Sequence, residues 1–153
     1  MSSTLQDKLS NDLKEAMRSK DLLRLSTLRL IKAGIQNEEI ARGKPLDDAA
    51  VIDLVSRQAK QRQDSIEQFK KGNRLDLVEK EEAELEVVKG YLPQQLTVGE
   101  IENLVTEVIQ KTGARSAVDK GKVMGALMPQ VRGRADGSIV NSVVSRLLGI
   151  ETA

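Results

Sequence analysis

Residues 119–138, DKGKVMGALMPQVRGRADGS, combine glycines with basic side chains, a mixture that can bind phosphate groups. Lys122, Arg132 and Arg134 are the cations of main interest, because charged groups are rarely fully buried without partners. Two interpretations are open at this point. The segment around Arg132 and Arg134 could be a solvated turn that is basic by chance. It could also be a concave loop followed by a helix N-terminus, both able to bind phosphate.

A nucleotide-binding loop of the Walker type is excluded by the residues around Gly121 and Lys122. That loop has the form G-x-x-x-x-G-K-[ST], because backbone amides and the lysine surround phosphates while the hydroxyl holds magnesium. Here Val123 follows Lys122, and the glycine that precedes the pair, Gly113, is too far away. We therefore expect no nucleotide cofactor.

The glycine spacing in the same stretch favours a structural role. Gly121 and Gly125 are four residues apart, so on a helix they lie on one side and would let another backbone approach closely. Gly133 suits a left-handed helix cap. The buried side of this helix is expected to carry Val123, Met124, Leu127, Met128 and Val131.

Catalytic chemistry is limited by composition. The chain has no histidine and no cysteine, which excludes Ser-His-Asp and Cys-His triads, thiolate metal sites and disulfides. The acidic run VEKEEAELE, residues 78–86, could suggest carboxylates for metal binding or acid–base chemistry. Glu79, Glu82 and Glu86 instead share the outer face of the helix expected there, so a solvated face is favoured. We expect no catalytic residue, no metal site and no cofactor.

Charge is balanced over the whole chain but not along it. The formal net charge is +1, yet residues 111–146 contain seven Lys/Arg against two Asp/Glu, whereas residues 1–92 contain 17 of each. A local basic patch is therefore possible. The longest apolar runs are only a few residues, so we expect no membrane span and no signal peptide, and a cytoplasmic location.

Apolar residues recur at helical spacing throughout, and no run alternates with period two long enough for a strand. The sequence therefore predicts an all-α fold. The first helix is expected to bury Leu5, Leu9, Leu13 and Met17, and the second begins its buried face at Leu22. The expected helices cover, approximately, residues 5–18, 21–43, 47–71, 75–92, 97–112, 118–131 and 136–148.

An internal boundary is predicted at LPQQLTVGE, residues 92–100. Pro93 cannot continue the preceding helix, and Thr97 followed by Glu100 is a capping box that opens a new one. We expect an N-terminal four-helix domain at residues 1–93 and a small C-terminal three-helix domain at residues 94–153.

Two long stretches resemble known sequences. Residues 62–97, RQDSIEQFKKGNRLDLVEKEEAELEVVKGYLPQQLT, resemble the hallmark segment of the YqeY-like family. Residues 121–148, GKVMGALMPQVRGRADGSIVNSVVSRLL, are similar to the motif that this family shares with the C-terminal tail of the B subunit of the glutamine-dependent aspartyl/glutamyl-tRNA amidotransferase. The combination covers nearly the whole chain.

The resemblance implies an all-helical fold of four helices and then three. In the amidotransferase the tail domain helps to hold tRNA, so the resemblance favours a non-catalytic module whose partner is tRNA or a tRNA-handling complex. The implied RNA-binding residues are Lys122, Arg132 and Arg134, with Lys120 and Arg115 behind them, and the shape-setting residues are Gly121, Gly125 and Gly133.

Two alternatives remain open. The family resemblance also suggests carbon–nitrogen ligase activity with glutamine as amido-N-donor, although nothing in this sequence matches the amidotransferase's ATP site or its Ser-Ser-Lys amidase arrangement. The other alternative is a protein-binding helical adaptor that uses the polar outer face of the third helix. The residues on that face are Arg57, Lys60, Arg62 and Lys70.

Overall fold

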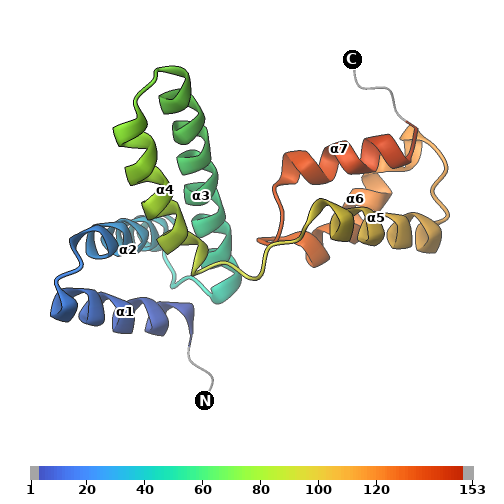
Figure 1. Ribbon diagram of the computed structural model, residues 1–153. Coiled ribbons are helices and arrows are strands. Elements are labelled where there is room, and N and C mark those ends of the chain that lie inside the picture. Colours follow the sequence, from blue (N-terminus) through green and yellow to red (C-terminus); the bar gives the residue numbers. More distant parts are fainter. Residues whose placement is uncertain (1–3, 150–153) are drawn as a thin grey trace. The chain divides into compact units, whose positions relative to one another are not determined.

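The structure of the protein, a computed structural model, describes residues 4–149. Within these residues the regular structure is entirely helical and contains no strand, which confirms the all-α prediction (Figure 1). The elements are α1 (Leu5–Ser19), α2 (Leu22–Arg42), α3 (Asp48–Lys71), α4 (Leu75–Lys89), α5 (Val98–Thr112), the 3-10 helix η1 (Ala117–Asp119), α6 (Lys120–Val131) and α7 (Gly137–Leu147).

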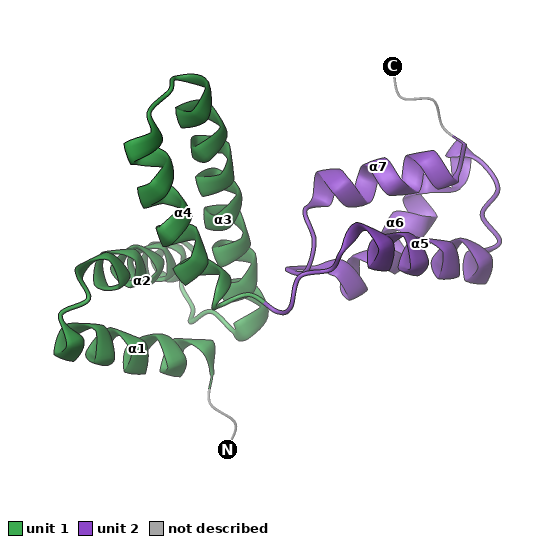
Figure 2. Ribbon diagram, viewed as in Figure 1, with its two compact units in different colours: residues 1–92 green, residues 93–153 purple. Residues whose placement is uncertain are grey.

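The chain divides into two compact units, residues 1–92 and residues 93–153, coloured green and purple in Figure 2. The first contains α1 to α4, and the second contains α5 to α7 with η1. Each unit has its own cluster of buried apolar side chains, and the two clusters share no residue. That residues 1–93 and 94–153 fold as separate domains stays a prediction.

The first unit is organised around the antiparallel hairpin of α3 and α4, its most extensive helix pair (Figure 1). Asn73 makes the turn with a φ of 54°, a left-handed conformation that asparagine tolerates better than most residues. α2 packs against α1, α3 and α4. Leu28, Ile31, Val55 and Val88 are among the fully buried side chains of this core.

The second unit packs α5 against α6 and α7, with η1 beside α6. Ile101 and Val105 from α5 meet Leu127 from α6 and Val140 and Val144 from α7 in one apolar cluster. None of the helices in residues 4–149 has the length and apolar character needed to cross a membrane.

Side-chain caps set the starts of several helices. The Thr97 hydroxyl accepts from the Glu100 amide at 3.1 Å, and the Glu100 carboxylate accepts from the Thr97 amide at 3.2 Å, which confirms the predicted capping box. Thr4 and Asp7 form a second box at the start of α1. Gly113 ends α5 with a φ of 69°, a conformation that favours glycine.

The predicted buried face of α1 is wrong at its last member. Met17 is 54% exposed, whereas Leu9 and Ala16 are buried. A four-residue step advances about 40° beyond a full turn, so Met17 lies roughly 120° around the helix from Leu5, whereas Ala16 lies roughly 20° from it. Leu22 is also exposed, because it is the first residue of α2 and projects from its end.

Two predicted helix ends and two predicted core positions also differ. α4 ends at Lys89 and not at residue 92, and the sixth helix begins at Lys120 because residues 117–119 form η1. Val118, expected to open that helix, is 92% exposed. Met128 is 42% exposed and Leu147, expected on the inner face of the last helix, is 40% exposed, so neither belongs to the buried core.

Candidate nucleic-acid interface

The five cations predicted to bind RNA lie at the two ends of α6. Arg115 precedes η1, and Lys120 and Lys122 lie in the first turn of α6. Arg132 and Arg134 follow its last residue. Because α6 has 12 residues, it is about 18 Å long, and one phosphate group cannot contact both ends. A polyanion that extends along the helix could.

Lys122 and Arg115 are exposed and therefore accessible to a partner. The Arg115 backbone amide donates to Asp119 Oδ2 at 2.9 Å, which fixes the loop before η1 and leaves the guanidinium at the surface. This carboxylate is one of only two acidic side chains in residues 111–146.

Gly121 and Gly125 are exposed as well, and the predicted close approach of a second backbone is wrong. A Cβ built on either glycine would meet no atom within 4 Å. The two residues lie on the same side of α6, as expected, but this side faces solvent and not another described helix of the unit. The apolar residues on the opposite side, Val123, Leu127 and Val131, are the ones that enter the core.

Lys120 points inward. Its side chain is half-buried, and Nζ donates to Ser145 Oγ on α7 at 2.9 Å. Ser145 is itself 1% exposed, so the pair lies at the contact of α6 and α7. Such a hydrogen bond from a charged donor stabilises a helix contact, and we assign Lys120 this positioning role.

Arg134 fixes the loop between α6 and α7 to the start of the second unit. Arg134 Nε donates to the carbonyl of Gln94 at 3.3 Å, and its own carbonyl accepts from the Leu96 amide at 2.8 Å. Gln95 Nε2 donates to the Gly133 carbonyl at 2.8 Å, and Gly133 has a φ of 74°. Gly133 thus occupies the left-handed conformation expected for it, in a loop held by three hydrogen bonds.

Arg132 is exposed and has an interaction partner within the molecule. Close by, Asp136 caps α7, where its Oδ1 accepts from the Ser138 amide and the Ser138 hydroxyl, each at 2.9 Å. A carboxylate therefore already occupies the N-terminus of α7. A second anion at that helix end would be repelled, so the cations and not this N-terminus are the candidates for phosphate contact.

The acidic run of α4 divides between surface and interior. Glu79, Glu82 and Glu86 are exposed, as predicted. Glu84 is 7% exposed and forms an ion pair with Arg62 of α3. Among residues 4–149, no group of three or more metal-ligating side chains is placed to hold an ion.

Arg62 was expected on the polar outer face of α3, and this is wrong. Its side chain is 12% exposed and pairs with Glu81 at 3.2 Å as well as with Glu84. The spacing of Arg62 between Ala59 and Ile66, both buried, was the available signal that this residue lies on the inner face. Of the other cations proposed for a protein-binding face, Arg57 pairs with Glu38, Lys70 pairs with Glu82, and Lys60 also has a partner.

These features define an all-helical protein with a three-helix unit in which α6 carries an exposed lysine beside two exposed glycines. A family model described as "Yqey-like protein" matches residues 6–148, and the chain belongs to this family. The resemblance to the YqeY-like family stated from the sequence is thereby confirmed.

Several fungal proteins are similar along most of their length. "Altered inheritance of mitochondria protein 41, mitochondrial" of Lachancea thermotolerans is 42% identical over 145 residues, covering 90% of this chain and 78% of the relative. Its namesake in Pyrenophora tritici-repentis is 40% identical, over 93% of this chain and 80% of the relative. The Saccharomyces cerevisiae protein of that name is 30% identical, over 90% and 80%.

The expectation of a cytoplasmic location is wrong on this comparison, because the names of these relatives are those of mitochondrial proteins. The expectation relied on the absence of cysteine and of a long apolar segment. Neither property distinguishes the cytoplasm from other aqueous compartments in which thiols are reduced.

Proposed function

We propose that the chain is a non-catalytic module that binds tRNA, or a complex that handles tRNA, through an exposed surface on α6. We call this surface the α6 face, and it consists of Gly121, Lys122, Gly125, Ala126 and Pro129, all exposed. The observation that carries the proposal is the open space beside the cation. Lys122 lies next to two glycines over which no side chain stands, so a sugar–phosphate backbone can approach the helix closely there.

The charges at the ends of the α6 face support an extended anionic ligand. Arg115 lies at the N-terminal end and Arg132 at the C-terminal end, and the ten steps along the chain from Lys122 to Arg132, just past the end of α6, correspond to about 15 Å at helical rise. Arg132 would share its charge between its present partner and a phosphate. Lys120 and Arg134 would act indirectly, by holding the helix and the loop in place.

Binding is expected to depend on phosphates and shape and not on base stacking. The chain has one phenylalanine, one tyrosine and no tryptophan, and both aromatic residues, Phe69 and Tyr91, lie in the first unit. The second unit therefore has no aromatic side chain on which a base could stack. A ligand with a defined backbone path, such as a folded RNA, suits this surface better than an unstructured single strand.

The experiment is filter binding of tRNA to the full chain at two or more salt concentrations. Phosphate contacts predict that log K falls linearly with log salt, and each lost contact should flatten the slope by about 0.7–0.9. We expect Lys122→Ala and Arg115→Ala each to flatten the slope of log K against log salt by about 0.7–0.9, the effect of one lost phosphate contact. Each should also weaken binding at low salt.

Lys44→Ala is the matched control, because Lys44 is an exposed lysine of the first unit, and its slope should equal that of the unchanged chain. Gly121→Leu and Gly125→Leu test the open space, and both should weaken binding without removing a charge. Absence of tRNA binding at low salt, or a slope that Lys122→Ala leaves unaltered, would refute the proposal. The names of the fungal relatives favour a mitochondrial location for such a module.

A further inference from the structure

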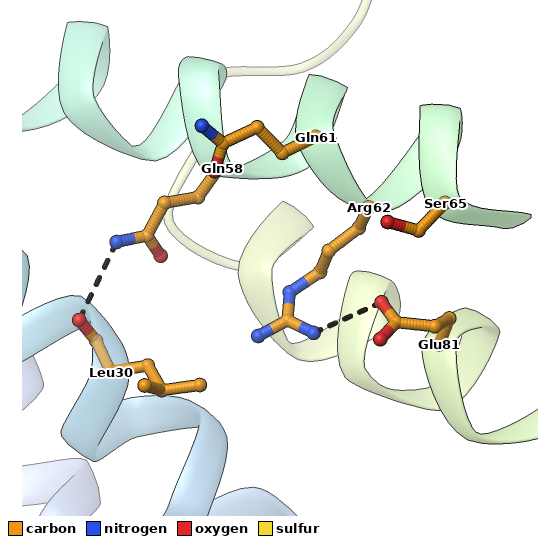
Figure 3. Close-up of a pocket in the computed structure, with 6 residues that line it drawn as sticks. All are labelled: Leu30, Gln58, Gln61, Arg62, Ser65 and Glu81. Atoms are coloured by element: carbon orange, nitrogen blue, oxygen red, sulfur yellow. Dashed lines mark hydrogen bonds and ion pairs between the residues drawn. The ribbon is translucent and has the colours of Figure 1, made fainter. Parts of the chain in front are cut away.

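The first unit contains an open groove between α2, α3 and α4, with a volume of about 300 Å³. Four of its lining residues come from α3 at spacings of three, four and seven residues, so they form one continuous stripe along that helix. Figure 3 shows the groove with α2 on one side and α4 on the other. The lining residues are Leu30, Gln58, Gln61, Arg62, Ser65 and Glu81.

The groove is electrically balanced. Arg62 Nη1 pairs with Glu81 at 3.2 Å and with Glu84, and Lys80 lies 4.0 Å from Glu84. Of the lining residues, Arg62 and Glu81 carry one positive and one negative charge, which cancel, and Glu84 and Lys80 form a further pair outside the lining. A phosphate or carboxylate would meet the Glu81 carboxylate beside the arginine, and a cation would meet the arginine itself, so an uncharged ligand is favoured.

Some polar atoms of the residues that line the groove have no hydrogen-bond partner among the described residues. Gln58 Oε1 and Arg62 Nε are buried and have no hydrogen-bond partner among the described residues. The second terminal nitrogen of Arg62 points away from Glu81, toward the side of the groove where Leu30 lies (Figure 3). The groove lining thus contains an acceptor without a partner, Gln58 Oε1, and a donor, the second terminal nitrogen of Arg62, and a buried polar group without a partner is costly.

The Gln58 side chain is placed so that it can turn toward a ligand. Its Nε2 donates to the Leu30 carbonyl at 3.4 Å, a long and weak hydrogen bond. Gly34 leaves the space for this amide, because a Cβ on Gly34 would lie 2.9 Å from Gln58 Nε2. Rotation of the Gln58 side chain would therefore break only this weak hydrogen bond, and it would present the side-chain oxygen to the groove.

We infer that this groove binds a short uncharged peptide segment of a partner protein. A peptide group offers one carbonyl acceptor and one N–H donor, which complement Arg62 and Gln58. The seven-residue span from Gln58 to Ser65 is about 10 Å, enough for about three residues of extended chain. Leu30, 55% exposed, supplies an apolar wall for one of their side chains. The inference concerns the first unit and is independent of tRNA binding.

Titration of the ¹⁵N-labelled full chain with a capped tri-alanine peptide, acetylated and amidated, tests the inference by NMR. Saturable shifts are expected for the side-chain NH₂ groups of Gln58 and Gln61 and for the Arg62 Nε–H. Gln58→Ala and Leu30→Ser should each weaken the apparent affinity about tenfold, as expected for the loss of one good contact. Both residues lie at the groove surface, so the fold should persist, and Arg62 is left intact because it holds a buried ion pair.

Gln36→Ala is the matched control, because Gln36 is an exposed glutamine of α2 outside the groove lining, and its titration should equal that of the unchanged chain. N-methylacetamide, inorganic phosphate and tRNA form the comparison arms. Binding of N-methylacetamide as tightly as the peptide would overturn the inference in favour of a small-amide site. Saturable shifts of the same resonances by phosphate or tRNA, or no saturable shift with the peptide, would also overturn it.

Discussion

Tyr91, which follows α4 near the C-terminal end of the first unit, contacts the first helix of that unit, α1. Its ring is buried, its hydroxyl donates to Asp12 Oδ2 of α1, and Lys8 Nζ lies 4.6 Å from the ring centroid. Lys8 Nζ also donates to the Gly90 carbonyl at 2.6 Å, and Arg24 lies 3.5 Å from Asp12. These contacts hold α1 against the end of α4, where sequence spacing predicted only continued helix.

Burial, and then the hydrogen bond and negative charge of Asp12, raise the pKa of Tyr91 above its ordinary value near 10. The folded state therefore favours the protonated phenol, and this contribution to stability is complete below pH 10 and is lost as the pH rises above it. The chain has one tyrosine and no tryptophan, so the ultraviolet absorbance of tyrosinate reports on Tyr91 alone.

We expect a higher titration midpoint in the folded chain than in denaturant, and Asp12→Asn should reduce the difference. Equal midpoints in the two states would contradict the buried, hydrogen-bonded phenol. Tyr91→Phe supplies the background, because it removes the absorbance change altogether.

At the scale of single helices, α1, α2, α3, α5 and α7 begin with a side-chain cap, whereas α4 and α6 do not. Arg74 occupies the N-cap of α4 without a capping hydrogen bond and instead pairs with Asp76 at 3.1 Å. The hydrogen bond from Arg74 lowers the pKa of Asp76. α5, in contrast, begins with the reciprocal Thr97–Glu100 box. Its first turn therefore has a defined stabilising contact that a single substitution can remove.

Thr97→Ala should lower the stability of the second unit by about 1 kcal/mol, because it removes the side-chain acceptor of the Glu100 N–H in the first turn of α5. Thr106→Ala is the control in the same helix, since Thr106 is exposed and its hydroxyl bonds the Glu102 carbonyl within the helix interior. Urea titration followed by NMR resonances of α5 to α7 measures both. A loss for Thr106→Ala equal to that for Thr97→Ala would show that the box has no special role.

At the scale of the whole molecule, the separation of the two apolar clusters is the main property. The second unit closes its own core with Ile101, Val105, Leu127, Val140 and Val144. The loop hydrogen bonds of Arg134 and Gln95 also stay within residues 93–153. Each unit thus contains what it needs to exclude water from its interior.

We predict that residues 93–153 fold without residues 1–92. The ¹H–¹⁵N spectrum of the fragment should overlay that of the full chain for α5 to α7, apart from positions near residue 93. A unit of 61 residues buries a smaller share of its surface than a larger domain, so a lower melting temperature than that of the first unit is expected. A collapsed, poorly dispersed spectrum would contradict independent folding.

Much of the fold could be predicted because helix formation depends on local spacing and local chemistry. The stripe of Ile101 and Val105, the capping box at Thr97 and the stop at Gly113 each lie within a few residues of the element that they specify. Family membership was also accessible, since it rests on residues 62–97 and 121–148 read in order.

The sequence by itself determined the all-α class, most helix positions, the outward direction of Glu79, Glu82 and Glu86, and the location of the cations at the two ends of one helix. Only the tertiary structure decided that Gly121 and Gly125 face solvent, that Lys120 bonds to Ser145, and that Arg62 lies inside with Glu84. Periodicity shows which residues share a face of a helix. Which neighbour covers that face depends on contacts between residues far apart in the chain, and local spacing carries no information about them.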